Sequence, residues 1–157
     1  MRILNITQHQ LTLEQEMEGA FTDHNHAAIK QALTFTSMPN KDMIEEKIHE
    51  LLEYAHMGLL DYTQMKFEMA REELLDCGFS EDDATDSGFK AIAKAEEEYG
   101  VMIGGATYLM APLENLLKKA GIRVFYAYSE RVGQEHVKPD GSVLKSFVFK
   151  HLGFYEA

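Results

Sequence analysis

The chain lacks the features that mark exported and membrane proteins. Cys77 is its only cysteine, so no disulfide can form within the chain. No apolar run approaches the roughly 18 residues that a membrane-spanning helix needs. The N-terminus has no basic stretch followed by an apolar run, as a signal peptide would have. These absences predict a reduced, cytoplasmic protein that has no membrane partner.

Familiar cofactor and metal motifs are also missing. The sequence contains neither the G-x-G-x-x-G fingerprint nor the P-loop lysine pattern, which argues against dinucleotide and NTP binding in their usual forms. His24 and His26 have no acidic or cysteine partner nearby that would complete a metal site. Cys77 has no identifiable base beside it to make it a nucleophile. The sequence therefore predicts no metal and no cofactor.

The length and composition are those of one soluble domain. The chain has 157 residues, of which 45% are hydrophobic and 26% are charged. A chain of this size can bury a substantial core, and its composition is that of an ordinary globular protein. We expect a single domain over residues 1–157.

The net charge of −11 is concentrated in the middle of the chain. Residues 41–100 contain six basic and 17 acidic residues, whereas residues 101–157 contain seven basic and five acidic ones. The overall acidity argues against long nucleic acid as a partner. The mildly basic last third still allows a small anionic ligand there.

The residue patterns predict strands at both ends of the chain and helices in the middle. Arg2–Thr7 is apolar and β-branched like a central strand, and Thr12-x-x-Gln15 is a capping box for a helix to about Phe21. Residues 33–37 alternate like a second strand, ending before Pro39. From about 41 to 98 the apolar spacing is helical throughout.

The last third predicts two strands joined by a helix and followed by a hairpin. Val101–Ile103 and Arg123–Tyr128 flank the helical segment, and Asp140-Gly141 marks a hairpin turn before the strand 145–150. The predicted fold class is α/β, with a small, Rossmann-like, mainly parallel sheet. A helical insertion at about 41–98 separates its second and third strands, and a C-terminal β-hairpin closes it.

The carboxyl ends of these strands are where such sheets bind ligands. After the first strand come Thr7, Gln8, His9 and Gln10, whose side chains suit hydrogen bonds to a ribose or a base edge. His9 is also a candidate general acid or base, because an imidazole titrates near neutral pH. The alternative is an ordinary polar loop.

Two further groups follow the third and fourth strands. Gly104, Gly105 and Thr107 lie where backbone N–H groups at a helix start can bind phosphate, although a tight turn that needs positive φ is the alternative. Ser129 and Arg131 follow Tyr128, and an arginine there can bind a phosphate with two hydrogen bonds. A surface ion pair is the competing interpretation of Arg131. Lys145 on the hairpin adds positive charge.

Three segments together resemble a known family. They are Ile3-Leu-Asn-Ile-Thr-Gln-His9 with its capping box, Tyr126-Ala-Tyr-Ser-Glu-Arg131, and the D-G-x-V-x-K…F-x-H-x-x-F run from Asp140 to Phe154. The set resembles the small stand-alone CRISPR-associated proteins of CARF (CRISPR-associated Rossmann fold) type, several of which are ring nucleases. The resemblance covers the first 15 residues and about the last 55, and it has no counterpart for residues 41–98.

The resemblance implies a protein of type III CRISPR antiviral signalling, either a ring nuclease or a protein that binds the same ligand without cleaving it. It implies a homodimer that binds a cyclic oligoadenylate across its two-fold axis and cleaves it without metal, as a phosphodiesterase that leaves 2′,3′-cyclic phosphate ends. The polar residues after the first, third and fourth strands fit these roles by position, with His9, Ser129 and Arg131 as the catalytic candidates. The alternative is a non-catalytic regulatory or adaptor protein whose acidic helical arm binds a protein partner.

Overall fold

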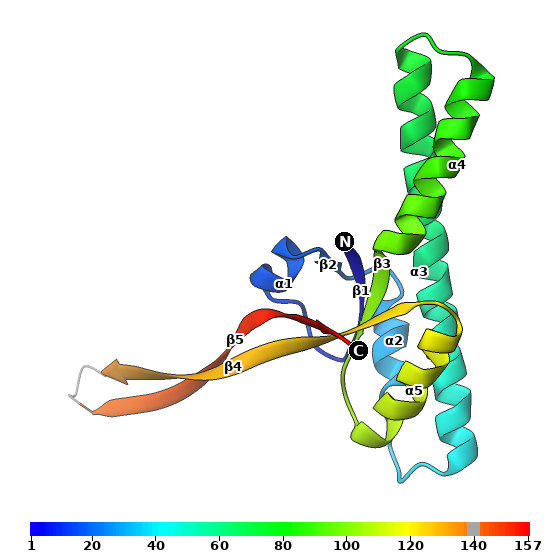
Figure 1. Ribbon diagram of the computed structural model, residues 1–157. Coiled ribbons are helices and arrows are strands. Elements are labelled where there is room, and N and C mark those ends of the chain that lie inside the picture. The colour runs from blue at the N-terminus through cyan, green and yellow to red at the C-terminus, as the bar shows by residue number, and fades with distance from the viewer. Residues whose placement is uncertain (138–141) are drawn as a thin grey trace.

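A five-stranded sheet forms the centre of the computed structural model, which describes residues 1–137 and 142–157 (Figure 1). The strand order is β2-β1-β3-β4-β5. The strands are β1 (Arg2–Ile6), β2 (Ala20–Phe21), β3 (Tyr99–Ile103), β4 (Arg123–Val137) and β5 (Val143–Glu156). The first four are mutually parallel and β5 is antiparallel to β4, so the fold is α/β with a mixed sheet.

Helices cover the two faces of this sheet unequally. The helices are α1 (Leu13–Met17), α2 (His26–Ala32), α3 (Lys41–Asp76), α4 (Glu81–Glu98) and α5 (Thr107–Lys119). On one face α2, α3 and α5 pack their apolar residues against Leu4, Ile6 and Val101 to form the main core. On the other face Ile3 and Met102 lie in a smaller cluster that Leu11 and Phe154 partly cover. This thinly covered face leaves room for a ligand.

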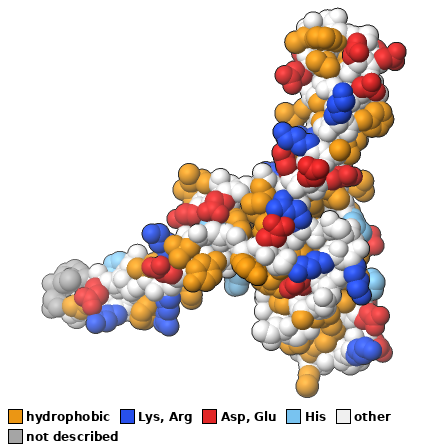
Figure 2. Space-filling view, viewed as in Figure 1, with side chains coloured by type: hydrophobic (Ala, Val, Ile, Leu, Met, Phe, Trp, Pro, Cys, Tyr) orange, Lys and Arg blue, Asp and Glu red, His pale blue; other side chains and the backbone are white. Residues whose placement is uncertain are grey.

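The helical prediction for residues 41–98 is confirmed, because α3 and α4 form a long antiparallel pair that extends away from the sheet (Figure 1). The side chains of Asn40 and Ser80 cap the two N-termini. Of α3, only the part from Ile44 to Tyr62 packs against the sheet core. Along the projecting end, acidic side chains are interspersed with hydrophobic ones (Figure 2). We call this projecting end the helical arm, residues 63–96.

The prediction of a strand at 33–37 is wrong. Helix α2 ends at Ala32, and the next residues form a loop whose Leu33 is buried in the main core. The alternation of residues 33–37 therefore reflects this loop packing on the core rather than a sheet. The second strand is the two-residue Ala20–Phe21, so the first helix ends at Met17 rather than near residue 21.

The fourth strand is longer than predicted. It continues through Ser129, Glu130 and Arg131 to Val137, because β5 pairs with it from Glu156 back to Val143. A single register shift interrupts the pairing, between Tyr128 and Ser129. The outer part, residues 129–137 and 143–151, projects from the body as a two-stranded ribbon that we call the β-hairpin (Figure 1). The predicted turn at Asp140-Gly141 lies outside the described residues.

No helix in the described part of the chain is long and apolar enough to cross a bilayer.

A bidentate ion pair joins the beginning of β4 to the end of β5. The Nε and Nη2 atoms of Arg123 each donate to a carboxylate oxygen of Glu156 at 2.7 Å. This hydrogen bonding holds the pKa of the Glu156 carboxyl below its ordinary value of 4.5. A carboxyl whose pKa is lower in the folded state stabilises the fold above its unfolded pKa, and this contribution is lost as the pH falls through the folded value.

We therefore expect Glu156→Gln to flatten the acid limb of the stability profile. Urea titrations between about pH 5 and pH 3 should show a smaller fall in unfolding free energy for this variant than for the unmodified chain. Glu96→Gln is the matched control, since Glu96 is exposed and no ion pair is described for it. Equal slopes for the unmodified chain and Glu156→Gln would show that the ion pair does not stabilise the fold.

Candidate functional site

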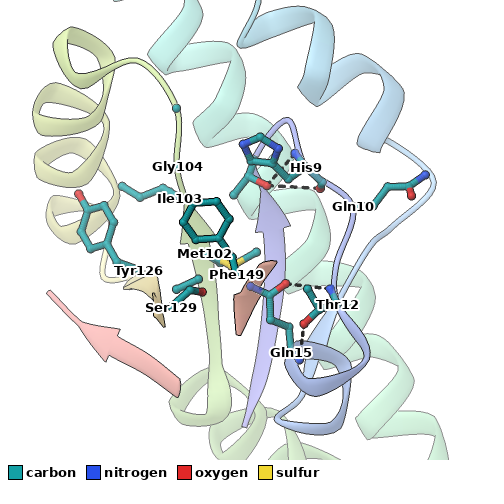
Figure 3. A pocket seen from close by; sticks show the side chains of 13 residues that line it. His9, Gln10, Thr12, Gln15, Met102, Ile103, Gly104, Tyr126, Ser129 and Phe149 are labelled. Atoms are coloured by element: carbon teal, nitrogen blue, oxygen red, sulfur yellow. Dashed lines mark hydrogen bonds between the residues drawn. The ribbon is translucent and has the colours of Figure 1, made fainter. Parts of the chain in front are cut away.

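A cavity of about 470 Å³ lies at the carboxyl ends of β1 and β3, beside α1 and the base of the β-hairpin (Figure 3). The chain passes from β1 to β2 on one side and later to β3 on the other, so the strand order reverses between β1 and β3. Open α/β sheets bind ligands at such a reversal, because the connections diverge there and leave a crevice. The lining residues are Thr7, His9, Gln10, Thr12, Gln15, Met102, Ile103, Gly104, Gly105, Tyr126, Ala127, Ser129 and Phe149.

The loop after β1 is held by the fully buried side chain of Asn5. Its Nδ2 donates to the carbonyl oxygen of His9 at 2.9 Å. Its Oδ1 accepts from the backbone N–H of Thr7 at 3.1 Å and from the Thr7 hydroxyl at 2.7 Å. The Nε2 of His26 lies 3.1 Å from the carbonyl oxygen of Thr7 and, as the protonated nitrogen, donates to it. These bonds fix the turn that presents His9 and Gln10 to the cavity.

Some polar groups of the cavity are already bonded within the protein, and others are free. Thr12 and Gln15 satisfy each other in the predicted capping box, which is confirmed. Within residues 1–137 and 142–157, the imidazole of His9, the amide of Gln10 and the hydroxyl of Ser129 have no hydrogen-bond partner in the protein. These three groups are available to a ligand.

The Gly104-Gly105 turn forms another part of the wall. Gly105 has φ +147°, a conformation that L-residues with a side chain rarely adopt, so the positive-φ requirement is real. A Cβ atom on Gly104 would lie 3.4 Å from Cγ2 of Thr7, so the two strand ends approach closely here. Helix α5 begins directly after this turn, and no side chain caps its first N–H groups. Free backbone donors therefore occur beside the cavity, as phosphate binding requires.

The structure brings six of the predicted site residues together and leaves four out. The six that line the cavity are Thr7, His9, Gln10, Gly104, Gly105 and Ser129. Gln8 instead donates to the carbonyl oxygen of Leu33 and to the hydroxyl of Thr34, both at 3.0 Å. Thr107 belongs to the first turn of α5 and does not line the cavity.

Arg131 and Lys145 lie on the β-hairpin and do not line the cavity, although Arg131 pairs with Phe149, which does. The guanidinium of Arg131 stacks over the ring of Phe147, with its carbon 3.8 Å from the ring centre. The ammonium of Lys145 forms an ion pair with Glu135 at 3.0 Å. The prediction placed Arg131 at the site because it ended the fourth strand at Tyr128, and it assigned Lys145 to the hairpin as a source of positive charge. The continuing strand places Arg131 in the β-hairpin instead.

Two aromatic residues of the site were not predicted. Phe149 and Tyr126 form an apolar wall of the cavity (Figure 3). The Tyr126 hydroxyl donates to Glu114 at 2.7 Å, and burial together with this hydrogen bond raises the pKa of Tyr126 to about 12. Tyr126 therefore stays a neutral hydrogen-bond donor near neutral pH. The only sequence signal for Tyr126 is its place in a predicted strand just before Ser129-Glu130-Arg131.

The lining of the cavity contains no lysine, arginine, aspartate or glutamate. It therefore offers neutral donors and acceptors, one free imidazole and two aromatic surfaces. Such a set suits a ligand with planar rings and hydroxyl groups, while the glycine turn suits a phosphate. Among the described residues, no three His, Cys, Asp or Glu side chains are grouped as a metal site would require.

Comparison with known proteins places the chain in a family. The sequence model of the uncharacterized protein MJ1673 family matches residues 72–155, more than half of the chain, so the chain belongs to this family. The match spans the end of α3 through most of β5, and so it includes Gly104, Gly105, Ser129 and Phe149. No curated protein and no solved structure matches the chain.

Proposed function

We propose that this member of the uncharacterized MJ1673 family binds a cyclic oligoadenylate in the cavity and cleaves it as a metal-independent ring nuclease, in the cytoplasm. The observation that carries the proposal is the place of the cavity, at the reversal of strand order between β1 and β3. Under this proposal the sheet is a Rossmann-like CARF fold, and residues 41–98 are a helical insertion into it.

The lining fits the parts of an adenylate. The rings of Phe149 and Tyr126 offer flat surfaces on which an adenine base can stack. Gln10 and Ser129 provide free hydrogen-bonding groups for ribose hydroxyls, and the N–H groups at Gly104-Gly105 suit a phosphate.

The size of the cavity bears on the assembly. A volume of about 470 Å³ lies in the lower half of the usual range for small-molecule sites, roughly 300–1,000 Å³. The cavity therefore holds one part of a ring of several nucleotides, and the rest lies at its mouth. The protein acts as a homodimer in this proposal, with residues of the second protomer contacting that part of the ring.

The proposed reaction needs only positioning and one proton acceptor. The ribose 2′-oxygen attacks the neighbouring phosphorus, the bond from phosphorus to the 5′-oxygen breaks, and a linear product with a 2′,3′-cyclic phosphate end results. The imidazole of His9 accepts the proton of the 2′-hydroxyl, and the 5′-oxygen leaves with a proton from water. Backbone N–H groups at the glycine turn stabilise the charge that develops on the phosphate. Ser129 positions the ribose.

Incubation of the purified protein with cyclic tri-, tetra- and hexa-adenylate in EDTA tests this function. We expect calorimetry to detect binding of one ring size and mass spectrometry to detect its linear product. His9→Ala should lower the cleavage rate about 100-fold while affinity changes little, in line with loss of a general base. His24→Ala is the control, because His24 is exposed and does not line the cavity.

Two results would contradict the proposal. Absence of binding to all three rings at 100 µM protein would remove the ligand class. If EDTA abolished cleavage and a divalent ion restored it, the metal-independent mechanism would be wrong even though the ligand was right.

The adaptor function remains the second candidate, and the helical arm favours it. Phe79, between α3 and α4, is 54% exposed, and Phe89, on α4, is 61% exposed, in a segment rich in acidic residues. Exposed aromatic residues of this kind are typical of surfaces that bind another protein. A chain that binds no oligoadenylate but loses a protein partner on Phe79→Ser would have this function instead.

A further inference from the structure

Strand β4 has one edge without a partner along the β-hairpin. Strand β3 pairs with β4 only as far as Phe125, whereas β5 pairs with the opposite edge as far as Val137. In the described part of the chain, no strand therefore pairs with the outer edge of β4 from Ser129 to Val137. Unpaired edges of this length readily add a further strand, and proteins usually cover or disrupt them.

The charges along this edge complement those of the same edge in a second copy of the chain. A strand that pairs with its own copy about a two-fold axis lies antiparallel to that copy. The axis passes beside one central residue, and each residue faces the one that lies equally far from the centre on the partner strand. The side chains of two facing residues point to the same side of the sheet. Within residues 129–137, two pairs of unlike groups meet this condition. They are Arg131 with Glu135, and Glu130 with His136. Both pairs are centred on Gly133.

We propose that the chain forms a homodimer in which the β4 edges of two copies pair antiparallel about a two-fold axis at Gly133. The register of β4 on β5 extends each pair of unlike groups into a row of three groups. Lys145 faces Glu135, which then faces the partner's Arg131. On the other side of the sheet, Lys150 faces Glu130, which faces the partner's His136.

Gly133 is suited to the centre of this interface. It lies opposite Phe147 in the hairpin, and a Cβ atom at position 133 would be 3.7 Å from that ring. Phe147 is 56% exposed in the single chain and has Arg131 stacked on it. In the dimer the two glycines meet without side chains between them, and the two Phe147 rings flank them. The pairing therefore shields aromatic surface that the single chain leaves in water.

The outer edge of β5 does not offer the same complementarity. Between Val143 and Tyr155 its only fully charged side chains are Lys145 and Lys150, with no carboxylate before Glu156. Pairing of β5 with its own copy would leave these lysines unmatched or place them against each other. The charges therefore favour pairing through β4.

This dimer would bring the partner's hairpin to the edge of the cavity. In the proposed register the partner's Val137 lies opposite Ser129, which lines the cavity. Each protomer thus places its Val137 beside the site of the other. The inference concerns the assembly and does not depend on the identity of the ligand. Because the axis lies at Gly133, a ring would bind at each cavity rather than across the two-fold axis.

Charge reversal on the full-length chain tests the pairing by sedimentation equilibrium. We expect Arg131→Glu to raise the dimer dissociation constant at least tenfold, because the partner's Glu135 then faces a like charge while the ion pair of Glu135 with Lys145 is untouched. The triple variant Arg131→Glu, Glu135→Arg, Lys145→Glu reverses the whole row and should restore the dimer. Lys118→Glu, on α5, is the control of equal charge change and should leave the dimer unaltered.

Oxidative cross-linking tests the register independently of affinity. In a Cys77→Ser background, Gly133→Cys places two cysteines directly opposite each other, about 4.5–5.5 Å apart at their Cα atoms, within disulfide range. We expect a covalent dimer from this variant and none from Glu130→Cys alone, whereas mixing Glu130→Cys with His136→Cys should give one. A monomer at 100 µM, or a dimer that resists Arg131→Glu and does not cross-link at position 133, would overturn the proposal.

Discussion

Replacing Asn5 with alanine is expected to lower the unfolding free energy by about 3 kcal/mol. Two described groups donate to the carbonyl oxygen of His9, the Asn5 amide at 2.9 Å and the Thr7 hydroxyl at 3.4 Å. The substitution removes the shorter of these two hydrogen bonds. It also removes the acceptor for both the N–H and the hydroxyl of Thr7. Each buried polar group left without a partner costs about 1–3 kcal/mol, and water can reach only part of this site.

Urea unfolding followed by circular dichroism measures this loss. Gln64→Ala is the matched control, since it also deletes a hydrogen-bonding side-chain amide, here one that donates to the Glu68 carboxylate at an exposed position on α3. We expect the control to change stability by less than about 0.5 kcal/mol. A loss of that small size for Asn5→Ala would mean that the buried network does not hold the loop after β1.

Local signals that persist over many residues made part of this fold predictable. The apolar spacing of residues 41–98, with capping side chains at Asn40 and Ser80, leaves few alternatives to two helices. The strands at Arg2–Ile6 and Tyr99–Ile103 are buried along nearly their whole length and therefore read as apolar runs. The prediction of a strand at 33–37 was wrong because an alternation over only five residues does not distinguish a strand from a loop that packs on the core.

The sequence predicted the part of the site that lies at the ends of β1 and β3. It did not predict the part that depends on how far β4 continues. The ends of β1 and β3 follow from their apolar residues, so Thr7, His9, Gly104 and Gly105 were placed together. The end of β4 is set by pairing with β5, a contact between distant parts of the chain that a local pattern does not contain. Arg131 was therefore assigned to a loop at the site although it lies in the β-hairpin.

The glycine turn gives the second large effect that we expect. If the proposed function is right, Gly105→Ala should weaken binding of the proposed ligand, a cyclic oligoadenylate, at least 30-fold, or about 2 kcal/mol. The added Cβ would lie 3.7 Å from Cε of Met110, an ordinary contact, so the effect comes from the backbone rather than from a clash. A residue with a side chain strains at φ +147°, and relief of that strain rotates the peptide groups on which the proposed phosphate contacts depend.

Gly121→Ala separates this effect from simple destabilisation. Gly121 also has positive φ, at +77°, but it is exposed after α5 and an added Cβ would have no heavy atom within 4 Å. Both variants should lose about 1–2 kcal/mol of stability from backbone strain, measured by urea unfolding. Only Gly105→Ala should lose affinity, measured by calorimetry under conditions where both variants are folded. Equal affinities for the two variants would show that the turn does not contact the ligand, because both variants carry backbone strain and only Gly105 borders the cavity.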